Sequence, residues 1–160
     1  MVSTGHGTTD PSILRTLMVF AASYIFALVV LYVVAMLVGL LSSAAASVGA
    51  MLAAGAQAGL GDAKRINAPA SGRRLVMLIT SSFFVAAVFS FAIYLLMPML
   101  HGASVLTVEL MFWDLLWWLG SLPSGALATV LAVFIVPNVF MLWFAYSPIT
   151  RWLWRQRSQV

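Results

Sequence analysis

The sequence predicts an all-helical, multi-pass integral membrane protein with four transmembrane helices and an interfacial or re-entrant helix in its outer loop. Of its 160 residues, 63% are hydrophobic and only 8% are charged. A soluble domain has about a quarter charged residues, so a globule of this composition could not cover its surface with polar groups. We therefore expect one membrane domain over residues 1–160, solvated largely by lipid.

Long apolar runs predict the spans. A helix needs about 20 apolar residues to cross a hydrocarbon core about 30 Å thick. The predicted spans are residues 13–41, 44–60, 75–97 and 126–147. The second run is the weakest, because it consists mostly of Ala and Gly and contains Gln57. A hairpin with the strong first span could carry it into the membrane.

The positions of the basic residues support an even number of spans. The eight Lys and Arg residues are Arg15, Lys64, Arg65, Arg73, Arg74, Arg151, Arg155 and Arg157. With four spans and a cytoplasmic N-terminus, all of them lie on the cytoplasmic side, as expected because positive charge resists translocation. The outer loop at 99–125 then holds Glu109 and Asp114 but no Lys or Arg. Without the span at 44–60, this segregation of charge is lost.

Tryptophans mark two segments that we expect at the membrane surface. Residues 104–119 are apolar almost all round, but a fifth span here would bring Glu109 and Asp114 to membrane depth. Because tryptophan rings prefer the headgroup level, an interfacial or re-entrant helix is favoured. The C-terminal tail provides a second, cytoplasmic anchor. The predicted interface anchors are Trp113, Trp117, Trp118, Trp152 and Trp154.

Small residues in the second span predict close helix packing. The candidate packing residues are Gly49, Ala53, Gly55 and Gly59. Small side chains let helices approach closely in lipid, where the hydrophobic effect does not drive association. The contact could be made with other spans of the same chain or between two copies. In either case this helix should be the most enclosed by protein, and Gln57 should find a partner other than lipid.

Polar residues in the spans are few. Pro137 lacks an N–H donor and predicts a kink in the fourth span. The neighbouring Asn138 could bond to the freed carbonyl, or it could bind a substrate or ion in a broken helix. Pro137, Asn138 and Gln57 are therefore the candidates for a kink or polar site. We expect no ionisable residue inside the spans, which argues against a proton-coupled pump.

The sequence does not predict an enzyme. There is no cysteine, and neither His6 nor His101 lies in a catalytic motif. On a helix, Glu109 and Asp114 would be about 140° apart, so with His101 they make a poor metal or acid–base set. We expect no catalytic residue, metal or cofactor.

The basic residues flank apolar segments, a pattern of membrane topology rather than of nucleic-acid binding. The loop predicted at 61–74 is short and basic. Attraction to anionic lipid headgroups explains it more simply than a protein partner does. The predicted partners are therefore a lipid bilayer that includes anionic lipids, and other membrane subunits or further copies of the chain.

A helix containing Ala53-Ala54-Gly55 precedes a polar segment with Lys64-Arg65, Pro69 and Arg73, and a more apolar helix follows. This order, over about a third of the chain, resembles a family of small bacterial inner-membrane proteins. The resemblance implies a four-helix fold in a bacterial inner membrane, and the charge pattern predicts that both termini are cytoplasmic. It implies no activity and therefore no site residues.

Two functions fit these observations. The first is a non-enzymatic accessory or assembly subunit that acts through helix–helix contacts. The alternative is a small oligomeric transporter or channel that uses the kinked fourth span. A wet cavity lined by Gln57, Asn138 and serines of the third span would favour transport, and a dry bundle with an exposed aromatic or glycine-lined surface would favour a partner.

Overall fold

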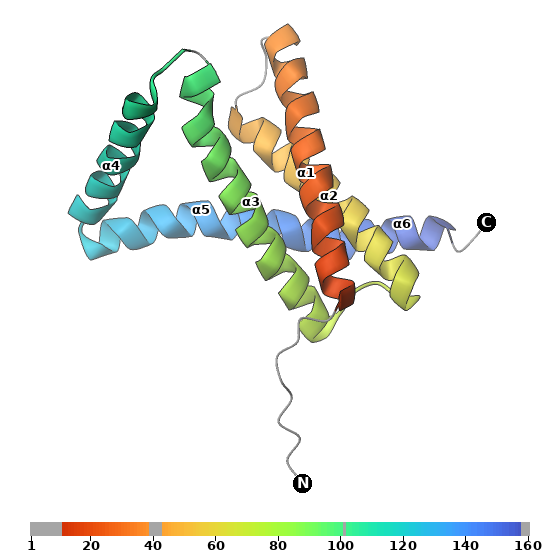
Figure 1. Ribbon diagram of the computed structural model, residues 1–160. Coiled ribbons are helices and arrows are strands. Elements are labelled where there is room, and N and C mark those ends of the chain that lie inside the picture. Colours follow the sequence, from red (N-terminus) through yellow and green to blue (C-terminus); the bar gives the residue numbers. More distant parts are fainter. Residues whose placement is uncertain (1–10, 39–42, 101, 158–160) are drawn as a thin grey trace.

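The computed structural model describes residues 11–38, 43–100 and 102–157, and every regular element in these ranges is helical (Figure 1). The helices are α1 (Pro11–Val38), α2 (Ser43–Ile66), α3 (Gly72–Leu100), α4 (Val105–Ser121), α5 (Ser124–Phe144), the π-helical turn η1 (Ala145–Ile149) and α6 (Thr150–Arg157). The predicted all-helical class is thus confirmed for the described residues. Residues 39–41 of the first predicted span lie outside them.

The first three helices form a bundle that the last part of the chain crosses. In Figure 1, α1 and α3 run in similar directions. Helix α2 runs the opposite way, from the end of α1 back towards the start of α3. Helices α5, η1 and α6 follow one another as a single long rod that lies across α1, α2 and α3 (Figure 1). The start of α1, the end of α2 and the start of α3 therefore meet at one end of the bundle, which we call the basic end.

Three helical segments are long and apolar enough to cross a membrane. They are Ile13–Leu31, Gly72–Leu96 and Ser124–Gln156. These segments lie in α1, α3 and the rod, as in a membrane protein. The Ala- and Gly-rich α2 is not among them, and its last turn carries Lys64 and Arg65.

The connection between α2 and α3 is shorter than the loop predicted at 61–74, which is a correction to the sequence analysis. Helix α2 continues to Ile66 and α3 already begins at Gly72. Asn67 ends α2 with a positive φ of 56°, and the Ala68 N–H donates to the Ala63 carbonyl at 3.1 Å. This is a Schellman cap, in which asparagine tolerates the left-handed conformation. Asp62 consequently lies in a helix rather than in a loop.

Aromatic rings from α1 and η1 fill the core against a face of α2 that carries only small side chains. The rings of Phe20 and Tyr24 stack at 5.8 Å, and Phe20 lies 6.5 Å from Tyr146. All three residues are fully buried. The opposing α2 residues include Ala50, Ala54 and Ala58, also buried. Large rings on one side and alanines on the other produce the interdigitation that dense packing requires.

Two glycines of α2 permit its closest contact with the rod. A Cβ atom placed on Gly55 would lie 2.8 Å from the Ala145 Cβ. On Gly59 it would lie 2.5 Å from the Thr150 Oγ1 and 3.0 Å from the Tyr146 Cδ1. Neither position has room for a side chain at the present separation, so the contact depends on glycine at both.

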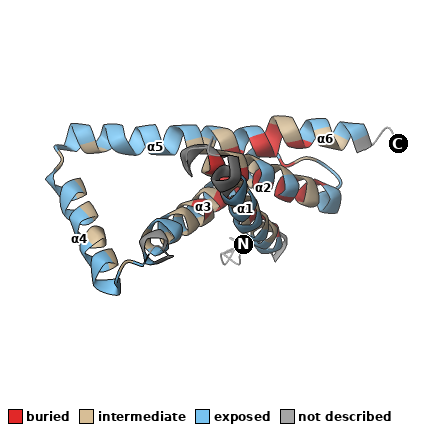
Figure 2. Ribbon diagram, turned by 90° about the horizontal axis from the view of Figure 1, so that it is seen from above, coloured by how far each residue is buried: buried red, intermediate tan, exposed pale blue. Residues whose placement is uncertain are grey.

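The buried residues gather where the rod crosses the bundle, and the rest of the chain beyond α3 projects from it (Figure 2). No residue of α4 is buried, and in α5 the buried residue is Leu142. We call α4 together with residues 124–136 the arm. Most of its side chains are apolar and exposed, including Trp117 and Val133. The arm packs on α3 through two ring contacts, Phe91–Phe112 and Phe83–Phe134, and contributes no buried residue to the core.

We predict that Gly55→Ala lowers the stability by about 1–3 kcal/mol, because the added methyl group overpacks the contact with Ala145. Thermal unfolding in mild detergent measures the change. Gly61→Ala is the matched control, because Gly61 lies in the same helix and nothing is within 4 Å of its Cβ position. Helix propensity should make this control equally or more stable, by up to about 1 kcal/mol. Equal unfolding temperatures for the two variants would contradict the contact.

Candidate functional site

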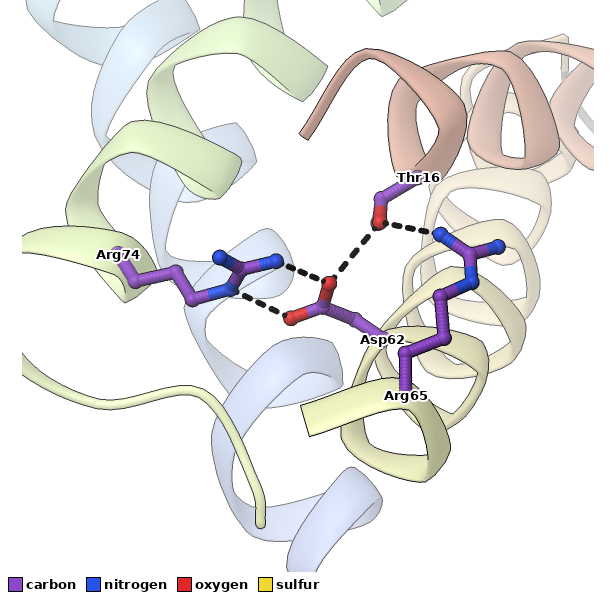
Figure 3. A network of polar contacts seen from close by, with 4 residues as sticks. All are labelled: Thr16, Asp62, Arg65 and Arg74. Carbon is purple, nitrogen blue, oxygen red and sulfur yellow. Dashed lines mark hydrogen bonds and ion pairs between the residues drawn. The ribbon is translucent and has the colours of Figure 1, made fainter. Parts of the chain in front are cut away.

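A buried carboxylate joins three helices at the basic end. Asp62 on α2 is fully buried, and Arg74 on α3 donates to both of its oxygens (Figure 3). The distances are 2.9 Å from Nε to Oδ2 and 2.6 Å from Nη2 to Oδ1. Thr16 on α1 donates through Oγ1 to Oδ1 at 3.0 Å. A two-point arginine–carboxylate pair with an added hydroxyl supplies the compensation that a buried charge needs.

Arg65 extends this network on the other side of Thr16. Its Nη1 donates to the Thr16 Oγ1 at 3.4 Å, a long hydrogen bond. The side chain of Arg74 is 22% exposed, whereas Arg65 belongs to the exposed class. Arg74 therefore neutralises Asp62 within the bundle, and Arg65 points a largely unused guanidinium outward.

A second polar contact lies beside the glycine contact of α2. The Ser82 Oγ on α3 and the Tyr146 hydroxyl on η1 are 2.8 Å apart, and both residues are buried. Thr150, also buried, donates through Oγ1 to the Ala145 carbonyl at 2.8 Å. The side chain thus binds a carbonyl of the preceding π-helical turn, and the same side chain packs against Gly59. These bonds tie the rod to α3 and complete its irregular turn.

A third group of polar residues borders a small cavity. The Tyr24 hydroxyl on α1 lies 3.1 Å from the Ser47 Oγ and 2.8 Å from the Ser90 Oγ. Both serines and Asn138 line a cavity of about 90 Å³ whose other walls are apolar. This is well below the roughly 300 Å³ of a typical small-molecule pocket. It could hold about three water molecules at about 30 Å³ each.

The chemistry open to these groups is limited by their burial and pairing. In the described ranges, every buried side-chain nitrogen or oxygen has a hydrogen-bond partner. Both Asp62 oxygens accept hydrogen bonds, from Arg74 and Thr16, so the carboxylate is held between α1 and α3. The same ranges contain no group of three His, Cys, Asp or Glu residues that could hold a metal. What the arrangement does is fasten helices together.

The predicted packing residues divide between two faces of α2. Gly55 and Gly59 face the rod, and a Cβ on Gly49 would lie 3.2 Å from the Leu31 Cδ1 of α1. Ala53 is exposed instead. Gln57 is exposed as well. Both lie on the outward face because their helical positions differ from those of Gly55 and Gly59 by about half a turn.

Asn138 does not bond to the carbonyl that Pro137 frees. Helix α5 continues through Pro137, and Asn138 donates through Nδ2 to the Phe134 carbonyl at 2.6 Å. That is not the carbonyl freed by Pro137, which belongs to the residue four positions earlier. The irregular backbone lies instead around Pro148, in η1. Proline there removes one helical donor, and the π-helical turn shifts the bonding so that the Thr150 N–H reaches the Ala145 carbonyl.

The aromatic anchors and outer acids lie on exposed helical surfaces. The exposed tryptophans are Trp113, Trp117 and Trp118 on α4 and Trp152 on α6. Trp154 is half-buried, and Glu109 and Asp114 are exposed on α4. His6 and His101 lie outside the described residues. None of the described anchors takes part in the three polar contacts above.

Asp62 is the residue that sequence reasoning missed, because it was assigned to a loop. Its partner Arg74 lies in the first turn of α3, at the start of the apolar segment Gly72–Leu96. The sequence does contain an indication of the buried role of Asp62. Asp62 follows Gly59 by three residues on the same face of α2, and it is an acid among four basic neighbours. If the helix of the second predicted span is extended past Leu60, Asp62 falls on the face that packs inside the bundle.

Comparison of the chain with protein-family models, with curated proteins and with solved structures finds no match. The fold and the contacts described above therefore carry the functional argument by themselves.

We predict that Asp62→Asn lowers the stability by about 3 kcal/mol, because it leaves Arg74 partly buried without a counter-charge. Adding Arg74→Gln should recover part of this loss, since the uncompensated charge is then removed. Thermal unfolding of both single variants and the double variant gives the coupling energy. Asp114→Asn, an exposed change of the same kind on α4, is the control and should have no effect. Additive losses in the double variant would rule out a coupled pair.

Proposed function

We propose that the chain is a non-enzymatic accessory or assembly subunit of a membrane complex and that it acts through helix–helix contacts. The observation that carries this proposal is the arm. Within the chain the arm contacts α3 through the ring pairs Phe91–Phe112 and Phe83–Phe134, yet most of its large apolar and aromatic side chains, such as Trp117 and Val133, stay exposed. A helical surface that the chain does not use for its own packing is available for a partner's helices.

The polar contacts support a structural rather than a chemical role. Asp62, Tyr146 and Tyr24 each join helices far apart in sequence, and each is occupied by these bonds. A rigid platform at the crossing of the rod and the bundle would hold the arm in a fixed direction. This favours presentation of a surface over binding of a substrate.

The proposed setting is a bacterial inner membrane, with four spans and both termini cytoplasmic. The charge pattern supports this topology, and so does the enclosure of α2 by α1, η1 and α6, which offsets its modest hydropathy. Because the rod crosses α1 and α3 rather than running beside them (Figure 1), the count of four spans rests on the charges and not on the arrangement of the helices.

A second candidate function is a small oligomeric transporter or channel. The cavity bordered by Ser47, Ser90 and Asn138 favours it, because these polar side chains come from three different helices. Gln57 does not contribute to this cavity, and the volume of about 90 Å³ is small for a solute. The accessory role is therefore the better supported of the two.

Purification in mild detergent from native membranes tests the proposal. We expect a heteromeric particle, and we expect Val133→Trp on α5 to dissociate it, because a bulky ring on the arm prevents close approach of another helix. Val88→Trp on α3 is the matched control, since Val88 is 65% exposed and Val133 is 69% exposed. A monomer or homo-oligomer as the sole particle would contradict the accessory role. Solute flux in proteoliposomes that Asn138→Leu abolishes would favour the transporter.

A further inference from the structure

We propose that the basic end carries a binding surface for the headgroups of anionic phospholipids. The surface consists of exposed side chains from the start of α1, the end of α2, the start of α3 and the start of α6. They are Arg15, Lys64, Arg65, Arg73 and Arg151. This inference is independent of the accessory role proposed above.

Polar and packing contacts hold the helical segments that carry these charges together. Arg65 reaches across to Thr16, the neighbour of Arg15, and Arg74 beside Arg73 is bound to Asp62. Arg151 follows Thr150, which meets Gly59 on α2 less than one turn before Asp62. Figure 1 shows the start of α1, the end of α2 and the start of α3 together at this end, and α6 beside the last part of α2.

The surface lacks an acidic counterpart within the described residues. Asp62 is the acid at this end, and Arg74 and Thr16 already occupy its oxygens. The other described acids, Glu109 and Asp114, lie on α4 in the arm. The five positive charges are therefore not balanced by carboxylates of the described chain, and an external anion would complement them.

Arg65 shows how such an anion could be bound. Its guanidinium makes one long hydrogen bond, to Thr16, and Figure 3 shows it on the side of Thr16 away from Arg74. The hydroxyl orients the guanidinium, and its other N–H groups remain available. A planar guanidinium matches the two unesterified oxygens of a phosphodiester in the same way that it matches a carboxylate.

The level of the surface along the helices identifies the anion as a lipid phosphate. The apolar segments of α1 and α3 begin at Ile13 and Gly72, so Arg15 and Arg73 lie at their ends, where headgroups would be. Next to Arg151, Trp152 is 59% exposed. An exposed tryptophan beside arginine at the end of an apolar helix is typical of the membrane interface.

Lipid binding to the purified full-length protein, measured by native mass spectrometry, tests the proposal. We expect phosphatidylglycerol to bind more tightly than phosphatidylcholine. The triple variant Arg15→Gln/Arg65→Gln/Arg151→Gln should bind phosphatidylglycerol about a hundredfold more weakly, since each charge near the surface contributes about fivefold in affinity. The triple Lys variant at the same positions retains the charge and should retain most of the binding.

Glu109→Gln/Asp114→Asn, which changes charge on the arm, is the control and should bind phosphatidylglycerol as the unmodified chain does. Equal binding of phosphatidylglycerol and phosphatidylcholine would overturn the proposal, and so would a Gln variant with full affinity. If inorganic phosphate alone competes as strongly as the lipid does, the site is a phosphate site and the lipid assignment is wrong. If the triple Gln variant does not fold, the triple Lys variant tests the proposal. Loss of phosphatidylglycerol binding in the Lys variant would contradict recognition by charge.

Discussion

The contact of Gly55 and Gly59 with Ala145, Tyr146 and Thr150 is the constraint on which the other contacts of the protein depend. It brings the backbone of α2 directly against side chains of the rod, with no α2 side chain between them. In lipid, where apolar surface gains little by leaving its solvent, such close packing is a main source of helix association. The π-helical turn lies at this same contact, so the irregular backbone of the rod is covered by α2.

The polar contacts follow from that approach. Tyr146 can reach Ser82 on α3 because α2 opposes it with glycine and alanine, and Asp62 lies less than one turn beyond Gly59, where α1 and α3 begin. Each polar contact joins helices that the glycine contact has already brought together. The basic surface depends on the same geometry, because Arg74 neutralises the acid and leaves the neighbouring positive charges without one. Packing at the centre of the bundle thus determines which basic residue at its end is neutralised by Asp62.

The all-helical class, the positions of the main helices and the enclosed character of α2 were predictable, because they depend on apolar runs and small residues that are local in sequence. The buried role of Asp62 was not, since it depends on where α2 ends, and that is set by the cap at Asn67. The sequence pattern predicted a kink at Pro137 and nothing at Pro148. The π-helical turn lies at Pro148, where Thr150 and the contact with α2 stabilise it. Hydropathy also cannot give the direction of the rod, which tertiary contacts decide.

Removing the Thr150 hydroxyl allows a direct test of the central contact. A Cβ on Gly59 would lie 2.5 Å from the Thr150 Oγ1, so Gly59→Ala should lower the unfolding temperature measured in mild detergent. We predict that this loss is smaller in a Thr150→Ala background, where the Oγ1 atom is gone, whereas Gly61→Ala, with nothing within 4 Å of its Cβ position, has the same effect in both backgrounds. An equal loss for Gly59→Ala in both backgrounds would show that α2 and the rod do not meet as described.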